Sequence, residues 1–131
     1  MRIAVASDDK KNTAYHLDGT EGFMIFDVVK GKIINYFYRP LYNPIYWQFS
    51  NGNDKSIGLC EAILKALTDC DTIISFGIET NILSKLSRAG IEVFQTNETD
   101  VSNAVELYIE AKLNNIQYSY RNYNYSKVQL Y

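Results

Sequence analysis

Residues 72–95 read TIISFGIETNILSKLSRAGIEVFQ, and they combine two strand-like runs with a helical pattern between them. The runs 72–76 and 91–95 are rich in β-branched and aromatic residues, which is typical of buried strands. Between them, residues 80–89 carry apolar side chains at helical spacing, and Gly90 occupies the position favoured for a left-handed helix cap. This region therefore predicts a βαβ unit with a right-handed crossover and two parallel strands.

The sequence on either side of this unit extends the same architecture. An apolar run at 2–6 predicts a strand buried on both faces, and Lys30-Gly31 predicts the tight turn of a hairpin. The expected elements are strands at 2–6, 23–29, 32–38, 72–76 and 91–95, with helices beginning near Asp54 and spanning 80–89 and 100–113. The order β-β-β-α-β-α-β-α predicts a single α/β domain over residues 1–113, with a mixed five-stranded sheet and helices on its faces.

Length, charge and composition limit the classes of function. The 131 residues suffice for one domain with its own core, and the formal net charge is −2. The four arginines are scattered, whereas binding along a nucleic-acid backbone needs clustered cations. No apolar run approaches the roughly 20 residues that span a bilayer, and Met1 leads directly into a strand without a signal pattern. We therefore expect a soluble, cytoplasmic protein without nucleic-acid or membrane partners.

Two further segments carry most of the aromatic residues outside the expected core. Residues 39–53 contain two prolines and four rings, and residues 114–131 form a tail rich in Tyr and Asn. The rings of the first segment are Tyr42, Tyr46, Trp47 and Phe49. Exposed aromatic patches mark interaction surfaces, so these rings are expected either to pack on the sheet or a second subunit, or to cover a ligand. One hypothesis is therefore a non-catalytic interaction module that forms a homo-oligomer through this loop and the tail, with no cluster.

Six short motifs, spread over residues 1–113, stand in a distinctive order. They are residues 1–8 (MRIAVASD), His16, residues 23–27 (FMIFD), residues 67–74 (LTDCDTII), Gly77 and residues 89–93 (AGIEV). In this order and spacing they resemble the dinitrogenase iron–molybdenum cofactor biosynthesis proteins. The resemblance implies a ribonuclease H-like fold. It also implies a non-enzymatic role in nitrogen fixation, in which the protein binds or carries an iron–molybdenum or iron–sulfur cluster for cluster-assembly proteins.

The only histidine of the chain, His16, matches the loop histidine of that family. Imidazole is a good ligand for transition metals, and ligands in open α/β sheets bind beyond the carboxyl ends of the strands. The first and fourth strands are expected to be parallel neighbours. We therefore predict a cofactor-binding site of Asp8, His16, Gly77 and Glu79, with His16 as the metal ligand.

The segment Gly77-Ile78-Glu79-Thr80-Asn81 connects a predicted strand to a predicted helix. Backbone N–H groups at a helix N-terminus attract anions, and either Thr80 or Asn81 is expected to cap the helix. The carboxylate of Glu79 would oppose an anion bound there.

The remaining candidate groups favour structural roles. Cys60 lies on the apolar stripe of a helix and Cys70 in a turn, so both are expected to be buried free thiols. A two-metal nuclease needs converging carboxylates, but Asp71 precedes the fourth strand and Glu61 lies off the core stripe. We therefore expect no catalytic residues.

Overall fold

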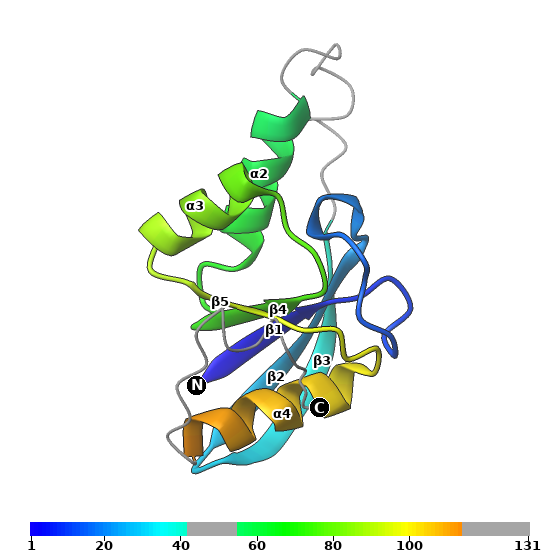
Figure 1. Ribbon diagram of the computed structural model, residues 1–131, viewed down its shortest axis with the longest axis vertical. Coiled ribbons are helices and arrows are strands. Elements are labelled where there is room, and N and C mark those ends of the chain that lie inside the picture. Colours follow the sequence, from blue (N-terminus) through cyan, green and yellow to red (C-terminus); the bar gives the residue numbers. More distant parts are fainter. Residues whose placement is uncertain (42–54, 114–131) are drawn as a thin grey trace.

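The computed structural model describes residues 1–41 and 55–113, and the side chains of residues 18, 55–59 and 113 are not described. Its elements are β1 (Arg2–Ala6), η1 (Leu17–Gly19), β2 (Gly22–Val29), β3 (Lys32–Pro40), α2 (Lys55–Ala66), β4 (Thr72–Ser75), α3 (Thr80–Arg88), β5 (Glu92–Gln95) and α4 (Val101–Leu113). The predicted mixed five-stranded sheet with three helices is confirmed (Figure 1). No helix within the described ranges is long and apolar enough to cross a membrane. The predictions for the aromatic loop and the tail concern residues 42–54 and 114–131, outside those ranges.

The strands lie in the order β3-β2-β1-β4-β5. β1 pairs with β4 in parallel, with Val5 opposite Ile74, and β4 pairs with β5 in parallel. β2 is antiparallel to both β1 and β3. The first and fourth strands are therefore parallel neighbours as predicted, and their carboxyl ends open at the same edge of the sheet.

The core has two layers, one on each face of the sheet. Because side chains alternate along a strand, Ala4 and Ala6 of β1 pack under α2 and α3, whereas Ile3 and Val5 pack against α4. Figure 1 shows α2 and α3 on one side of the sheet and α4 on the other. The predicted burial of this strand on both faces is confirmed.

The β2–β3 hairpin turns at Lys30 and Gly31, whose φ angles are 52° and 79°. Both residues thus have a left-handed backbone conformation, which matches the twist of a two-residue hairpin turn. This conformation explains why the second position is a glycine. β3 extends two residues beyond the predicted end, because Arg39 and Pro40 still pair with the beginning of β2. The register shifts between Asp27 and Val28.

A network of charged side chains covers the sheet at the amino ends of β1 and β4. Arg2 binds Asp27 through Nε at 2.7 Å and Nη2 at 3.1 Å, and it binds Asp69 through Nη1 at 2.7 Å. Arg39 binds the same Asp69 carboxylate through Nη1 at 2.8 Å and Nη2 at 2.9 Å. Both guanidinium groups lie over the Phe37 ring, 5.3 and 5.5 Å from its centroid. The hydrogen bonds to these arginines hold the pKa values of the Asp27 and Asp69 carboxyls below their usual range.

Candidate functional site

The loop that leaves β1 is fixed by its own polar side chains. Ser7 Oγ donates to the Asn12 carbonyl at 2.6 Å and accepts from the Lys10 N–H at 3.0 Å. Asp9 Oδ1 accepts from the N–H groups of Lys11 and Asn12 at 2.9 and 2.7 Å. These backbone hydrogen bonds, that of Asn12 first, lower the pKa of the Asp9 carboxyl to about 2. Asp9 therefore shapes the loop, and its oxygens are occupied.

His16 lies at the exit of β4. The loop returns to β1 through the Ala14 N–H, which donates to the Ala6 carbonyl at 2.7 Å. The Leu17 N–H then donates to the Gly77 carbonyl at 3.1 Å. A β-carbon at position 77 would lie 2.9 Å from the Tyr15 carbonyl oxygen and 3.6 Å from His16 Nδ1. The exposed imidazole therefore sits beside Gly77, as predicted, and a glycine is required there because the two chain segments approach so closely.

The N-terminus of α3 follows directly after this contact. Glu79 is the N-cap residue, and it makes no side-chain capping hydrogen bond. The prediction that Thr80 or Asn81 caps the helix is wrong, because the chain enters α3 one residue earlier and Asn81 Oδ1 accepts instead from the Ile82 N–H at 2.9 Å. The first N–H groups of a helix lack intrahelical partners. Asn81 thus satisfies one of these donors, and the carboxylate of Glu79 at the same end is exposed.

Asp8 is engaged elsewhere in the loop. Its Oδ1 accepts from the Glu21 N–H at 2.8 Å and from Thr20 Oγ1 at 3.2 Å. Within residues 1–41 and 55–113, no group of three or more His, Cys, Asp or Glu side chains is placed to hold a metal ion. The structure thus brings His16 to Gly77, but it does not assemble Asp8, His16 and Glu79 into one ligand set.

Both cysteines are buried free thiols, as predicted. Burial raises the pKa of the Cys60 thiol, and burial together with the Asp69 carboxylate raises the pKa of Cys70 to about 12. Cys70 lines a groove of about 630 Å³ with Leu64 and Ile91. This groove lies at the amino ends of β4 and β5, the opposite end of the sheet from His16 and Gly77.

Two further residues shape this region although the sequence pattern does not single them out. Tyr15 presents its carbonyl to Gly77 and packs its ring edge-on against Phe76, with centroids 5.1 Å apart. The Thr20 hydroxyl contacts the Asp8 carboxylate, and it also donates to the Gly22 carbonyl at 2.9 Å. For Tyr15 a signal existed, since it directly precedes the only histidine. For Thr20 none did, because its partners are set by the path of the loop.

Comparisons with known proteins concern the family and the fold of the chain. The family model described as dinitrogenase iron–molybdenum cofactor matches residues 1–111. An uncharacterized protein of Methanocaldococcus jannaschii is 26% identical over 113 residues, which are 86% of this chain and 89% of that protein.

Solved structures show the same fold. One is a crystal structure of an M. jannaschii protein provisionally described as a dinitrogenase, with TM-score 0.61, 18% identity and coverage of 86% of this chain and 90% of that chain. Another is the apo form of the orange protein of Desulfovibrio gigas, with TM-score 0.57, 16% identity and coverage of 87% and 88%.

Proposed function

The chain belongs to the dinitrogenase iron–molybdenum cofactor family, and from this premise we propose that it binds or carries an iron–molybdenum or iron–sulfur cluster, or a precursor of one. It does so in the cytoplasm as an accessory to cluster-assembly proteins rather than as an enzyme. The observation that carries the proposal is the position of His16 beside Gly77, where β1 and β4 both end. The strand order β3-β2-β1-β4-β5 supports the ribonuclease H-like form of this fold.

The donor set of the described residues determines which kind of cluster binding fits. Clusters assembled on a protein are usually held by several thiolates. Here the Cys60 and Cys70 thiols are buried, and their raised pKa values disfavour the thiolate form that binds metal. The described residues therefore fit a carrier that receives an intact cluster as cargo, and they do not fit a scaffold that builds one on cysteines.

His16 and the N-terminus of α3 supply the contacts that such cargo requires. The exposed imidazole offers a nitrogen ligand to a metal atom at the cluster surface. The N-terminus of α3, where the N-cap residue Glu79 makes no side-chain hydrogen bond, favours the negative charge that sulfide-rich clusters carry. Glu79 stands at the same helix end, so its carboxylate either ligates a metal atom or limits the bound charge.

Anaerobic incubation of the full chain with a preformed iron–molybdenum–sulfide cluster, followed by desalting, tests the proposal. Metal analysis and visible absorbance then measure what remains bound. We expect retained metal with sulfide-to-metal charge-transfer bands. A wild-type chain that retains neither iron nor molybdenum would remove the carrier function.

Matched variants identify the binding residues. H16A should retain less metal, whereas the C60A/C70A double variant should retain as much as wild type, because its missing thiols lie in the core. The reverse pattern would indicate assembly on the cysteines and contradict the proposed site. E79Q distinguishes the two roles of Glu79, since a ligand role predicts weaker retention and charge repulsion predicts stronger retention.

A further inference from the structure

β3 is a long strand at one edge of the sheet. Among the described residues its only sheet neighbour is β2, so its other side presents backbone N–H and C=O groups without a strand partner. It has nine residues, whereas β5 at the opposite edge has four and begins with a charged residue, Glu92. Long edges are templates for pairing with another strand, and short charged edges are protected from it.

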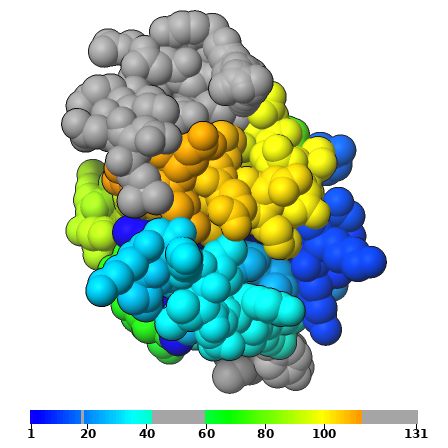
Figure 2. All heavy atoms as spheres, turned by 90° about the horizontal axis from the view of Figure 1, so that it is seen from below, coloured from blue at the N-terminus to red at the C-terminus, as the bar shows by residue number. Residues whose placement is uncertain are grey.

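The middle of β3 lacks the residues that usually prevent such pairing. Residues 33–38 read IINYFY, without charge, glycine or proline, and the charged residues and the proline of β3 stand only at its two ends, as Lys32, Arg39 and Pro40. The side chains of Ile34 and Tyr36 are 65% and 66% exposed. Figure 2 shows residues 30–40 as a broad open surface beside α4. An uncharged window with strong β-propensity, exposed on an edge, favours β-pairing.

The backbone pattern fixes which groups face outward. The Leu41 N–H donates to the Glu21 carbonyl at 2.8 Å, so in this antiparallel ladder residues 39 and 37 also turn their N–H and C=O groups toward β2. Tyr36 and Tyr38 consequently turn theirs toward the free edge. Ile34 falls at the register shift and has no partner on β2.

We propose that β3 pairs antiparallel with β3 of a second copy of this chain, about a two-fold axis at Tyr36. In this register the whole strand overlaps its counterpart, with Lys32 opposite Pro40 of the second copy. Ile34 then lies against Tyr38 of the second copy, and the two Tyr36 residues meet at the axis. Aromatic and β-branched pairs of this kind stabilise antiparallel strands.

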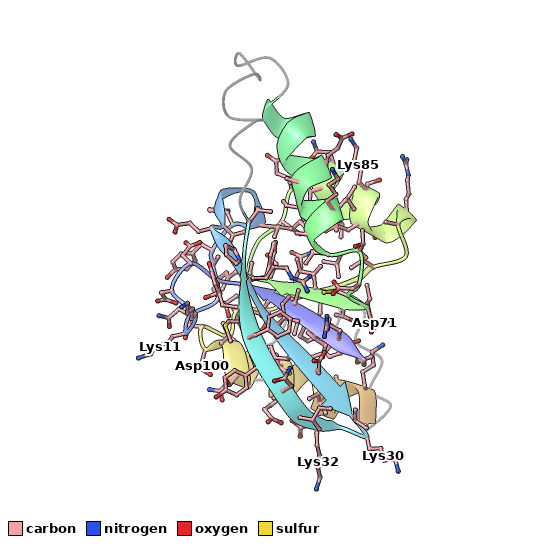
Figure 3. The ribbon with its side chains drawn as sticks, turned by 180° about the vertical axis from the view of Figure 1, so that it is seen from behind. Lys11, Lys30, Lys32, Asp71, Lys85 and Asp100 are labelled. Carbon is pink, nitrogen blue, oxygen red and sulfur yellow. The ribbon has the colours of Figure 1, made fainter. Side chains whose placement is uncertain are left out.

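The charges along the edge favour this antiparallel arrangement. Lys30 and Lys32 project at the hairpin end, far from Lys11 and Asp100 at the other end of the sheet (Figure 3). Three carboxylates stand near the far end of β3, where the Arg39 guanidinium is already held by Asp69. Burial is the main cause that raises the pKa of the Tyr38 hydroxyl, and the nearby carboxylates of Asp8, Glu21 and Asp9 raise it further.

A two-fold axis at Tyr36 brings the lysines of each copy to the acidic end of the other, whereas parallel pairing would set lysine against lysine. Lys10, whose Nζ lies 5.4 Å from the Tyr38 centroid, offsets part of this attraction. Because the pairing is two-fold and uses the only long edge within the described residues, it closes at a dimer.

Sedimentation of the full chain over a range of concentrations tests the proposal. We expect a concentration-dependent monomer–dimer equilibrium, and we expect Y36K to weaken it by about tenfold or more because it places two cations at the axis. Y15K is the matched control, because Tyr15 is 67% exposed but lies off β3. Circular dichroism and thermal melting establish that both variants fold.

A cysteine at the axis tests the register. Backbone-paired residues of antiparallel strands have Cα atoms about 5.5 Å apart, within the range of a disulfide. Y36C should therefore form a covalent dimer on mild oxidation, and Y15C should not. A wild-type chain that stays monomeric to about 1 mM, assemblies larger than dimers, or equal cross-linking of Y36C and Y15C would each overturn the proposal.

Discussion

The two ends of the β1–β4 strand pair are built in opposite ways. At the amino ends, Arg2 and Arg39 share the Asp69 carboxylate, so charges of opposite sign satisfy one another. At the carboxyl ends, the loop is shaped by backbone contacts to Gly77, and the His16 imidazole and the α3 N-terminus stay open to solvent. At one end of this strand pair the charged side chains thus neutralise one another. At the other end, a side chain that can bind a metal and the N-terminus of a helix remain exposed.

This difference indicates which end of the strand pair is able to bind a ligand. Charged groups that neutralise each other cover the sheet and stabilise the fold, but they have little capacity left for a ligand. Groups held in place by the backbone keep their own chemistry available. The clusters of charge that stand out in the structure are therefore structural, whereas the single exposed imidazole lies at the end for which we propose a function.

The largest effect is expected from Gly77. In G77A the new methyl group would lie 2.9 Å from the Tyr15 carbonyl, so the loop must move away from β4. We expect a loss of about 2 kcal/mol in the free energy of unfolding, measured by urea denaturation, and a shifted His16 resonance in NMR spectra. G19A is the control, because a β-carbon there has no neighbour within 4 Å. Equal stability of the two variants would refute the close approach.

The next effect is expected at the amino ends. D69A removes the hydrogen bonds from Arg2 and Arg39 together, and since these side chains are partly exposed, the loss should be about 1 kcal/mol. Metal retention should be unchanged. E106A, which removes an exposed carboxylate on α4, is the control for denaturation. A change in metal retention in D69A would mean that the two ends are not independent.

The acid dependence of stability should differ between the ends. A carboxyl whose pKa is lowered by folding stabilises the protein above its unfolded pKa, and this stability is lost as pH falls through the folded pKa. For Asp9 the values are 3.8 and about 2, so the stability gap between wild type and D9A should close between about pH 4 and about pH 2. The gap for D69A should persist further into acid, because the pKa of Asp69 is lower still. Denaturation at stepwise pH measures both gaps, and identical profiles would contradict the assignment.

The smallest effect on stability is expected at His16. Because the imidazole is exposed, H16A should change the free energy of unfolding by less than about 0.5 kcal/mol while metal retention falls. Thermal melting with metal analysis on the same samples separates the two readouts. A strong loss of stability would make His16 a structural residue and the lowered retention a consequence of misfolding.

The sequence predicts those features that depend on residues close together along the chain. The hairpin turn could be predicted because a glycine separates two strand-like runs. The burial of Cys60 could be predicted from the helical spacing of the apolar residues around it. The cap of α3 was not predictable, because the side chains of Thr80 and Asn81 both suit a cap, whereas the path of the chain makes Glu79 the N-cap residue. The sequence predicts Asp8 as a site residue, but it does not predict that the Asp8 carboxylate accepts from Thr20 and the Glu21 N–H, which only the folded loop brings near.

The sequence by itself determined the strands, the helices and the parallel βαβ unit, because periodicity and turn residues act within a few positions of the chain. Only the tertiary structure decided that the Asp8 carboxylate accepts from Thr20 and the Glu21 N–H, and that two distant arginines share Asp69. These contacts join residues that are far apart in sequence, and their geometry follows from sheet order and loop path. Tertiary packing thus determines which side chains remain exposed, whereas the local sequence pattern determines the helices and strands that carry them.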